Sequence, residues 1–373
     1  MATPPSQPLL EDSLLDRSRS ARTRLLLEAA ERLGFAHVGV CPAEPVDRRE
    51  QLSNWLDEGK HGEMNYLSDR VEAMLDPESV LEGARSIICV ADRYASASED
   101  PAPAAPRGRI ARYARGRDYH DVLRRRLARL AAAIEDHAPG HRARGVVDTA
   151  PLMEREHALR AGLGLIGKNT LMIRPGEGSW MVLGEVLTTL ELEPGPEPEW
   201  GGRGDPCGSC TRCIDACPTS AIEPFTIDAT RCVSYQTIEH RGPIDPEGHR
   251  SIGDWLFGCD VCQEVCPHNL PQRRVGSLPV LDPYRPRRDG FDLLEVLDWR
   301  EEDRRAAFTT SSLKRAKLET FKRNALICAG NVLEAGPHPE LRARIRALAE
   351  DDSEPALVRD TARAVLGRLP PGE

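Results

Sequence analysis

Two cysteine-rich stretches carry the clearest chemical signal in this sequence. Residues 207–218 read CGSCTRCIDACP and residues 259–267 read CDVCQEVCP, with Cys232 between them. The first stretch has the spacing C-x2-C-x2-C-x3-C-P of proteins that hold two [4Fe–4S] clusters, in which the fourth cysteine of a run ligates the other cluster. The spacing therefore predicts one cluster on Cys207, Cys210, Cys213 and Cys266, and a second on Cys217, Cys232, Cys259 and Cys262.

Zinc and disulfides are the alternatives for such a set of thiols. A four-cysteine zinc site would leave cysteines unused and would not require the two Cys-Pro endings. Disulfides need an oxidising compartment, and residues 1–13, MATPPSQPLLEDS, lack the basic and apolar regions of an export signal. The cysteines therefore favour iron–sulfur clusters and electron transfer, but they do not identify the electron acceptor.

Residues 162–170, GLGLIGKNT, resemble two nucleotide-binding motifs without satisfying either. The dinucleotide motif needs a strand before its glycines and a helix after them, whereas here a helix is predicted before and a β-prone run, 170–173, after. The phosphate-loop motif needs Ser or Thr after its lysine, where this chain has Asn169. We exclude nucleotide binding, and we keep the backbone amides as candidates for holding another polar cofactor.

Asp148 lies within residues 145–151, which are predicted to be a strand that leads into a helix at 152–160. Pro151 suits the first turn of that helix. Asp148 or Thr149 is then expected to cap it, and the residues alone favour this structural role over a catalytic one.

Basic residues gather in two places. Nine arginines lie within residues 107–129, several beside tyrosines on a predicted loop, as in surfaces that contact RNA phosphates and bases. A second basic set on the predicted tail helix would suit a nucleic-acid backbone: Lys314, Arg315, Lys317, Lys322 and Arg323. A solvated helix face is the alternative at both places.

The elements that position these residues indicate a mixed fold. Helices are predicted at 20–33 and 122–137, and a helical stretch that ends at Trp55 lies between them. Buried strands are predicted at 35–42, 86–91 and 180–188, and Cys41 and Cys89 on them are expected in the core. Residues 1–15 are expected to form a tail, and 95–106 and 192–206 to be a loop and a linker. Helices at 303–308, 313–330, 340–351 and 354–369 suggest HEAT-like repeats.

Length and composition limit the class of protein. With 373 residues, 40% of them hydrophobic, the chain can form two or three domains. We expect a cytoplasmic protein without membrane contact, because no stretch approaches the ~20 apolar residues of a membrane span. The net charge of −9 argues against a generic nucleic-acid binder but allows local basic surfaces.

Together, these motifs resemble the epoxyqueuosine reductase family. The matching stretches are 112–120 (RYARGRDYH), 147–155 (VDTAPLMER), 161–170 (AGLGLIGKNT), 178–185 (GSWMVLGE), both cysteine stretches, 232–239 (CVSYQTIE) and 322–325 (KRNA). The resemblance runs from about residue 20 to the end of the chain. One departure is Met74, where the family usually has an Arg near cobalamin; Arg70 is the candidate to substitute for it.

The resemblance implies a cobalamin-dependent enzyme that reduces epoxyqueuosine to queuosine in a tRNA anticodon loop. It implies an α+β fold: an N-terminal α/β cobalamin-binding catalytic domain (1–200), a ferredoxin-like two-cluster domain (201–285) and a C-terminal α-helical, HEAT-like tRNA-binding domain (286–373). Two [4Fe–4S] clusters would feed electrons to cobalamin from an external low-potential donor of the flavodoxin or ferredoxin type. We expect a monomer.

The resemblance also assigns roles to residues. It makes Asp148 the proton donor, a role that needs a pKa raised by burial. Cobalamin contacts are implied at Ala111, Arg112, Asp148, His157, Lys168, Asn169, Met172, Ser234, Gln236 and Asp260. Two other functions remain as alternatives: a cobalamin-dependent reductive dehalogenase, which would leave the basic tail without a role, and a ferredoxin-type electron carrier, which would leave Asp148 and residues 162–170 unexplained.

Overall fold

The computed structural model describes residues 8–95, 106–195, 204–270 and 280–370. Its main sheet has the strand order β1-β2-β7-β4, with every neighbouring pair antiparallel. The strands are β1 (His37–Pro42), β2 (Ser86–Arg93), β7 (Met181–Thr188) and β4 (Ala143–Val146). Strands were predicted at these places, with bounds that differ by a few residues.

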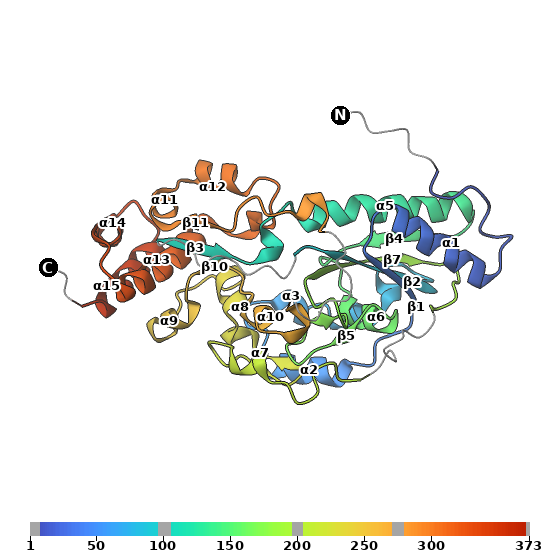
Figure 1. Cartoon of the computed structure of the whole chain (residues 1–373), viewed down its shortest axis with the longest axis horizontal. Coiled ribbons are helices and arrows are strands. Elements are labelled where there is room, and N and C mark those ends of the chain that lie inside the picture. Colours follow the sequence, from blue (N-terminus) through green and yellow to red (C-terminus); the bar gives the residue numbers. More distant parts are fainter. Residues whose placement is uncertain (1–7, 96–105, 196–203, 271–279, 371–373) are drawn as a thin grey trace.

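Helices cover both faces of this sheet, and so every residue of β2 is buried. Helices α1 (Arg19–Arg32) and α5 (Tyr119–His137) lie on the face that Ile88 and Val90 enter. Helix α6 (Glu154–Arg160) lies on the opposite face, against Ile87 and Cys89 (Figure 1). Cys41 and Cys89 are buried as expected.

Two details at the N-terminal side differ from prediction. Within residues 8–15, which were expected to be a tail, Leu10 and Leu14 are buried in the core beside α1 and α5, so that expectation was wrong there. Helix α5 begins at Tyr119 rather than Val122, because the Asp118 side chain accepts the His120 backbone N–H and caps the first turn. The predicted loop 95–106 and much of the linker 192–206 lie outside the described residues.

A second sheet, in the order β10-β3-β11, joins distant parts of the chain. Its strands are β10 (Trp255–Phe257), β3 (Arg107–Ile110) and β11 (Gly290–Asp292), one from each of the three predicted domains. The backbones of β3 and β11 approach closely here. A Cβ at Gly290 would lie 2.0 Å from the carbonyl oxygen of Gly108, and only glycine avoids this clash. The arginine-rich segment is thereby fixed against both the cysteine-rich region and the tail.

Short elements surround the cysteines. Helices α7 (Arg212–Asp215), α8 (Val233–Ile238) and α10 (Val261–Glu264) carry or adjoin them, and α9 (His249–Ile252) lies between α8 and α10 in the sequence. Two hairpins, β5 (Leu165–Ile166) with β6 (Met172–Ile173) and β8 (Ile222–Glu223) with β9 (Thr226–Ile227), complete the region. Helices α2 (Arg49–Asp57), α3 (Asn65–Ser68) and α4 (Val71–Leu75) connect β1 to β2.

The C-terminal part is helical, as predicted. It comprises α11 (Leu293–Asp298), α12 (Glu301–Phe308), α13 (Leu318–Ala335), α14 (Pro339–Glu350) and α15 (Ala356–Arg368). Residues 312–315 form a 3-10 turn, so α13 starts later than the predicted residue 313. One core continues from α8 and β10 into α13–α15, which holds the tail firmly on the cysteine-rich region (Figure 1). Within the described ranges, no helix is long and apolar enough to cross a bilayer.

Candidate active site and cysteine-rich region

The seven cysteines of the two stretches, together with Cys232, lie in two neighbouring groups. Burial raises the pKa of the Cys266 thiol, and the nearby thiols of Cys207, Cys213 and Cys210 raise it further. These four are the residues that the crossover spacing predicts for one cluster. Because Cys266 comes from the second stretch, the fold brings it across to the first.

The second group forms in the same way. Burial, with contributions from Cys232 and Cys217, raises the pKa of Cys259 to about 12. Burial also raises the pKa of Cys262, and Cys259 and Cys232 add to the shift. Thiols packed this closely in a buried region disfavour their own ionisation, and a bound cationic metal centre would reverse that preference.

The glycine-rich stretch 162–170 serves the first cysteine group. It forms the β5–β6 hairpin instead of the strand–turn–helix that a nucleotide would need. The Lys168 backbone N–H donates to Cys207 Sγ at 3.3 Å, and its Nζ donates to the carbonyl oxygens of Gly208 at 2.6 Å and Cys210 at 3.2 Å. Lys168 therefore holds the first cysteine loop in place.

Asp148 lies at the other end of the site, just beyond β4, with a positive φ of 44°. Its Oδ2 lies 3.0 Å from Nε2 of His120 and accepts the Tyr119 hydroxyl at 3.1 Å. His120 Nδ1 lies 2.7 Å from Oδ1 of Asp118. The tertiary structure thus builds an Asp118–His120–Asp148 row at the start of α5.

This row changes the expected protonation of Asp148. The hydrogen bond from His120 lowers the pKa of Asp148, although partial desolvation of this 44% exposed side chain acts in the opposite direction. The prediction that burial raises the pKa of Asp148 was therefore wrong. Burial would lower the pKa of His120, but hydrogen bonds to Asp118 and Asp148 outweigh it and raise that pKa to about 9. Near neutral pH the proton of the pair resides mainly on His120.

Asp148 and Thr149 do not cap the following helix, contrary to the sequence prediction. Helix α6 begins at Glu154 after Met153, without a side-chain cap. The Asp148 backbone N–H instead donates to Oε1 of Glu154 at 2.6 Å. Burial, reinforced by Glu185, raises the pKa of Glu154 well above its ordinary value. The Glu154 side chain thereby fixes the backbone of the Asp148 loop.

The predicted cobalamin contacts fall into separate groups. Ala111 and Arg112 lie against the second cysteine stretch, where the Arg112 N–H donates to Oδ2 of Asp260 at 2.7 Å. Lys168 and Asn169 lie beside the first cysteine loop. Ser234 and Gln236 follow Cys232 on α8. Met172 and His157 are buried near α6, where His157 Nδ1 lies 2.9 Å from Oε1 of Glu185.

Several buried polar atoms in these groups have no hydrogen-bond partner among the described residues. They include His157 Nε2, Asn169 Nδ2 and Gln236 Oε1. Buried polar atoms are normally paired. A cofactor edged with amide groups, as a corrin is, would supply both donors and acceptors for them, so the residues present fit cobalamin.

Tyr113 connects the two ends of the site. Burial raises the pKa of its hydroxyl, and Asp148 and Asp260 both add to the shift. Its ring meets Tyr119 edge-on, with centroids 6.0 Å apart. Tyr113 is therefore near both Asp148 and Asp260. Because Asp260 lies between Cys259 and Cys262 in the sequence, the second cysteine group is the one nearer to Asp148.

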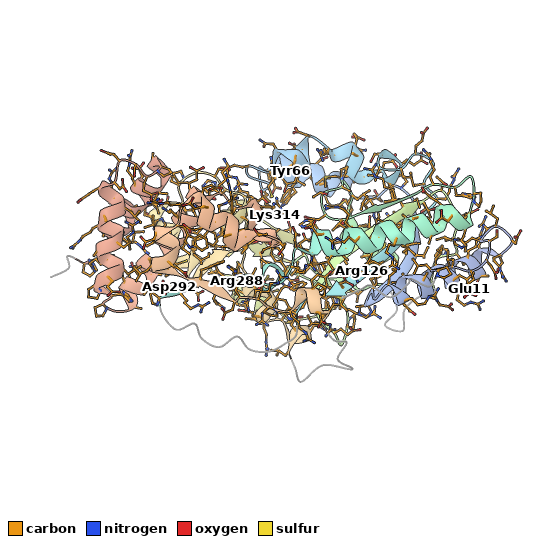
Figure 2. The ribbon with its side chains drawn as sticks, turned by 90° about the horizontal axis from the view of Figure 1, so that it is seen from above. Glu11, Tyr66, Arg126, Arg288, Asp292 and Lys314 are labelled. Carbon is orange, nitrogen blue, oxygen red and sulfur yellow. The ribbon has the colours of Figure 1, made fainter. Side chains whose placement is uncertain are left out.

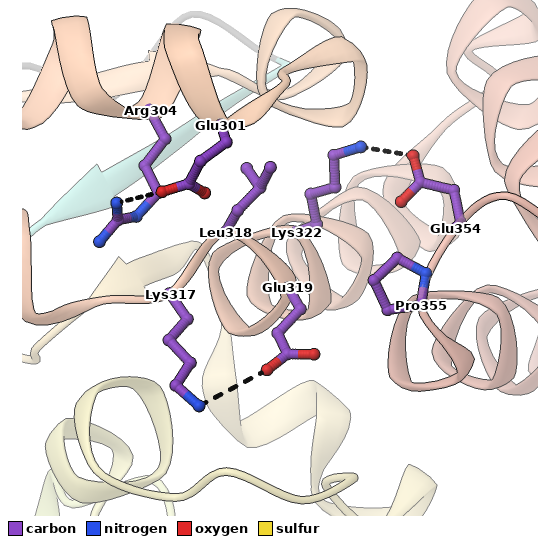
Figure 3. A pocket seen from close by; sticks show the side chains of 8 residues that line it. All are labelled: Glu301, Arg304, Lys317, Leu318, Glu319, Lys322, Glu354 and Pro355. Atoms are coloured by element: carbon purple, nitrogen blue, oxygen red, sulfur yellow. Dashed lines mark hydrogen bonds and ion pairs between the residues drawn. The ribbon is translucent and has the colours of Figure 1, made fainter.

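Several of the basic residues that were expected on the surface are buried in the structure. Arg112 and Arg115 are buried in the loop rather than presented to solvent. On α13, Lys322 is 5% exposed and its Nζ pairs with Glu354 at 2.5 Å beside a pocket of about 380 Å³ (Figure 3). Arg323 is buried and donates to the carbonyl oxygens of His240, Gly242 and Gln236. The expectation that Lys322 and Arg323 face RNA was wrong.

Three other side chains lie near the exposed carboxyl of Asp148, and the surface around this carboxyl is called the entrance below. Arg315 and Lys314 are 44% and 54% exposed, and Lys314 Nζ contacts Oδ2 of Asp118 at 2.5 Å. Tyr66 is 46% exposed; burial raises its pKa, and Glu239, Arg315 and Asp148 are among the groups that act on it. Figure 2 labels Tyr66 and Lys314, both of which lie near the middle of the length of the molecule. Tyr66, Arg315 and Lys314 are called the entrance residues below.

Arg70 lines a second pocket, of about 370 Å³, on the far side of the Asp148 loop. Arg124 and Arg144 line it too, with residues 145–147 and 149–151. Tyr119 and His120 lie in the matching stretch 112–120, but the sequence predicted no role in the site for them or for Glu185. The Asp-x-His spacing of Asp118 and His120 at a helix start was the available signal for the row.

A two-cluster cysteine region joined to an α/β layer that presents an acid defines an iron–sulfur oxidoreductase. Comparison with known proteins is more specific. Residues 75–149 match the family model described as epoxyqueuosine reductase QueG, DUF1730, and residues 206–269 match the 4Fe-4S double cluster binding domain. The chain is 42% identical to the epoxyqueuosine reductase of Gloeobacter violaceus, over 81% of this chain and 93% of that protein. It is 36% identical to that of Pseudomonas aeruginosa, over 91% and 93%.

Solved structures agree. A crystal structure of epoxyqueuosine reductase with an epoxyqueuosine-modified tRNA-Tyr stem loop superposes with a TM-score of 0.80 at 30% identity, covering 92% of this chain and 89% of that one. The Streptococcus thermophilus enzyme gives 0.80 at 30% identity, over 93% and 90%. A structure from Bacillus subtilis, in which a catalytic aspartate loop is swung out of the active site, gives 0.79 at 29% identity, over 92% and 89%. The chain belongs to the epoxyqueuosine reductase family.

Proposed function

We propose that this protein reduces epoxyqueuosine to queuosine within the anticodon loop of tRNA. The observation that carries the proposal is that Asp148, hydrogen-bonded to a proton-bearing imidazole, lies across Tyr113 from the second cysteine group. A proton donor and an electron source thus meet at one site, as reductive opening of an epoxide requires. The relatives named above support this substrate.

The cysteines hold two [4Fe–4S] clusters in this proposal. Cys207, Cys210, Cys213 and Cys266 ligate the first, and Cys217, Cys232, Cys259 and Cys262 ligate the second. The two groups of neighbouring thiols support that assignment. The position of Asp260 between two ligands of the second cluster makes that cluster the one nearer to Asp148. An external donor of the flavodoxin or ferredoxin type delivers electrons to the first.

The residues that would hold cobalamin lie on both sides of Tyr113 in the sequence and include the loop before it. Bound cobalamin supplies a nucleophilic centre that accumulates two electrons delivered singly. The unpaired polar atoms of His157, Asn169 and Gln236 would hydrogen-bond its amide groups, and the loop with Ala111 and Arg112, fixed by Asp260, would help to hold it. Lys168 contributes to the site indirectly, because it holds the first cysteine loop in place. Met172 is buried and contributes by packing in the core.

Asp148 is the proton donor to the epoxide oxygen. Negative charge develops on that oxygen as the ring opens, and a positioned acid accelerates such a step by roughly 10²–10⁴-fold. Its carboxyl is 44% exposed toward the entrance, where a base swung out of the RNA can reach it. Tyr119 and Glu154 hold the carboxyl and its backbone in place.

The entrance residues are the proposed RNA contacts. Single-stranded loops are recognised by stacking of unpaired bases on aromatic rings and by Arg or Lys at phosphates. Tyr66 provides an exposed ring beside Asp148, and Arg315 and Lys314 provide charge on the tail side. Arg315 pairs with Glu239 at 2.6 Å and Lys314 with Asp118 at 2.5 Å, so RNA phosphates would compete with these carboxylates for the two cations.

The test is direct conversion of a defined substrate. Reconstituted enzyme with both cofactors, a chemical reductant and an epoxyqueuosine-containing stem loop should yield queuosine, measured by nucleoside mass spectrometry. Cells lacking the gene should accumulate epoxyqueuosine in their tRNA. Unchanged epoxyqueuosine in the complete reaction, or normal queuosine in the deletion strain, would contradict the proposal.

A further inference from the structure

The His120 ring lies between two carboxylates, and both of its nitrogens are engaged. Nδ1 is 2.7 Å from Oδ1 of Asp118, and Nε2 is 3.0 Å from Oδ2 of Asp148. Ionised carboxylates only accept hydrogen bonds, so a ring that satisfies both must donate from both nitrogens, which only the imidazolium does. The His120 side chain is 10% exposed and that of Asp118 is 1% exposed, while Asp148 opens to the entrance at 44%.

The surrounding charges support this protonation. Lys314 Nζ lies 2.5 Å from Oδ2 of Asp118, and hydrogen bonds from His120 and Lys314 lower the pKa of Asp118 although its burial acts to raise it. Asp118 therefore stays ionised and does not carry protons. Around Asp148, Tyr119 donates a hydrogen bond, Arg315 adds positive charge, and the side chain of Glu154 accepts the backbone N–H.

The proposed reaction needs more protons than Asp148 can hold. Conversion of an epoxide to an alkene breaks both C–O bonds, forms a C=C bond and releases the oxygen as water. It consumes two electrons, which the clusters supply one at a time, and two protons. Asp148 delivers one proton at a time and its pKa is lowered, so it must take up a further proton during the reaction, and His120 is the proton-bearing side chain in contact with it.

We propose that His120 is a positioning residue that stores the proton for Asp148 and reloads it. The Nε2 proton of His120 passes to Oδ2 of Asp148, Asp148 passes it to the epoxide oxygen, and the imidazole takes its next proton from solvent. Asp118 keeps the ring oriented and cationic, much as the buried aspartate does in a Ser-His-Asp triad. This inference rests on the proposed function and specifies how its acid is supplied.

The test is the pH dependence of single turnovers by pre-reduced holoenzyme with an epoxyqueuosine stem loop, so that the external electron donor cannot limit the rate. The wild-type rate should fall as the pH rises through about 9, where His120 loses its proton. His120→Gln still donates a hydrogen bond to Asp148 but carries no transferable proton. Its rate should be about 10²-fold lower, with the basic limb near pH 9 absent.

Asp118→Asn tests whether His120 supplies protons or has only a structural role, because the His120 imidazole remains in this variant. Removing one carboxylate should move the basic limb toward the ordinary histidine pKa of about 6.5. His137→Gln, at the other end of α5, is the matched control and should keep the wild-type profile. Iron and cobalamin content and thermal unfolding are measured on every variant.

A His120→Gln rate within about twofold of wild type, or an Asp118→Asn profile that does not shift, would overturn the inference. An NMR titration of the histidine ring signals in substrate-free holoenzyme provides a readout that needs no turnover. The signal missing in His120→Gln should titrate near 9 in wild type and at lower pH in Asp118→Asn. If wild type fails to convert the stem loop while this titration holds, the proposed function fails and the protonation of the row stands.

Discussion

Nε2 of His120 and Oδ2 of Asp148 lie 3.0 Å apart, although the two residues are separated by 28 positions in the sequence. One stands in the first turn of α5, and the other follows β4 in a left-handed backbone conformation. Packing of α5 beside β4 brings them together. The contact places a cationic imidazole behind the carboxylate that faces the entrance.

Replacement of Asp148 tests its role as proton donor. Asp148→Asn keeps the size and much of the hydrogen bonding of the side chain but cannot transfer the proton. We expect a rate roughly 10²–10⁴-fold lower in single turnovers. Iron content should be unchanged, because the side chain belongs to neither cysteine group, and cobalamin content is measured because Asp148 is also an implied cobalamin contact. Near-wild-type turnover with full cofactor content would show that another residue supplies the proton.

Pairs of cysteine substitutions test the crossover of Cys266. If Cys266 and Cys213 ligate the same cluster, Cys213→Ser with Cys266→Ser should reduce iron from about eight to about four atoms per chain. Cys262→Ser with Cys266→Ser should remove ligands from both clusters and leave little iron. Cys328→Ala, a buried cysteine of α13 outside both groups, is the control. The reverse pattern would assign Cys266 to the cluster of Cys262.

The entrance residues are tested by RNA binding. Tyr66→Ala should weaken stem-loop binding about tenfold, because stacking of one base on an aromatic ring contributes about 1–3 kcal/mol. Tyr66→Phe should retain most of the affinity. Phe225→Ala removes a similarly exposed ring, 48% against 46%, from the β8–β9 turn and should leave binding unchanged. Fluorescence anisotropy of a labelled stem loop measures all three, and equal losses for Tyr66 and Phe225 would reject the entrance as a specific contact.

Glu177 is expected to control stability in acid. Its carboxylate pairs with His37 at 2.9 Å and Arg93 at 2.8 Å, and with Arg174 at 2.9 Å. Although burial opposes it, the hydrogen bond with His37, helped by Arg174, lowers the pKa of Glu177 to about 2. A lowered carboxyl pKa gives stability that is present above about pH 4.5 and is lost as the pH falls through about 2.

Glu177→Gln should therefore reduce the free energy of unfolding by about 1–2 kcal/mol at neutral pH, after allowance for solvent screening. The difference from wild type should shrink as the pH falls below about 4.5. Denaturant titrations at a series of pH values measure it. A difference that stays constant over that range would mean that Glu177 acts through packing and not through its charge.

Much of the site was predictable where chemistry depends on local spacing. The cysteine stretches identify cluster chemistry because Cys-x2-Cys loops can wrap a cluster only at particular intervals. The strands β1, β2 and β7 and most helices were predictable from apolar periodicity. The absence of a helix cap at Asp148 was not, because Pro151 and Thr149 have turn-forming properties that suit a helix start two residues earlier than the packed structure adopts.

The sequence alone determined the family and the cysteines, since both depend on residue type and near-neighbour spacing, and the resemblance to that family made Asp148 the candidate acid. Only the tertiary structure decided the protonation of that acid, because the pKa of Asp148 depends on His120 and Tyr119, which reach it across the fold. It also decided which basic residues face solvent. Lys322 and Arg323 read as a basic helix face, but the shared core turns them inward, whereas Arg315 stays at the entrance beside Asp148.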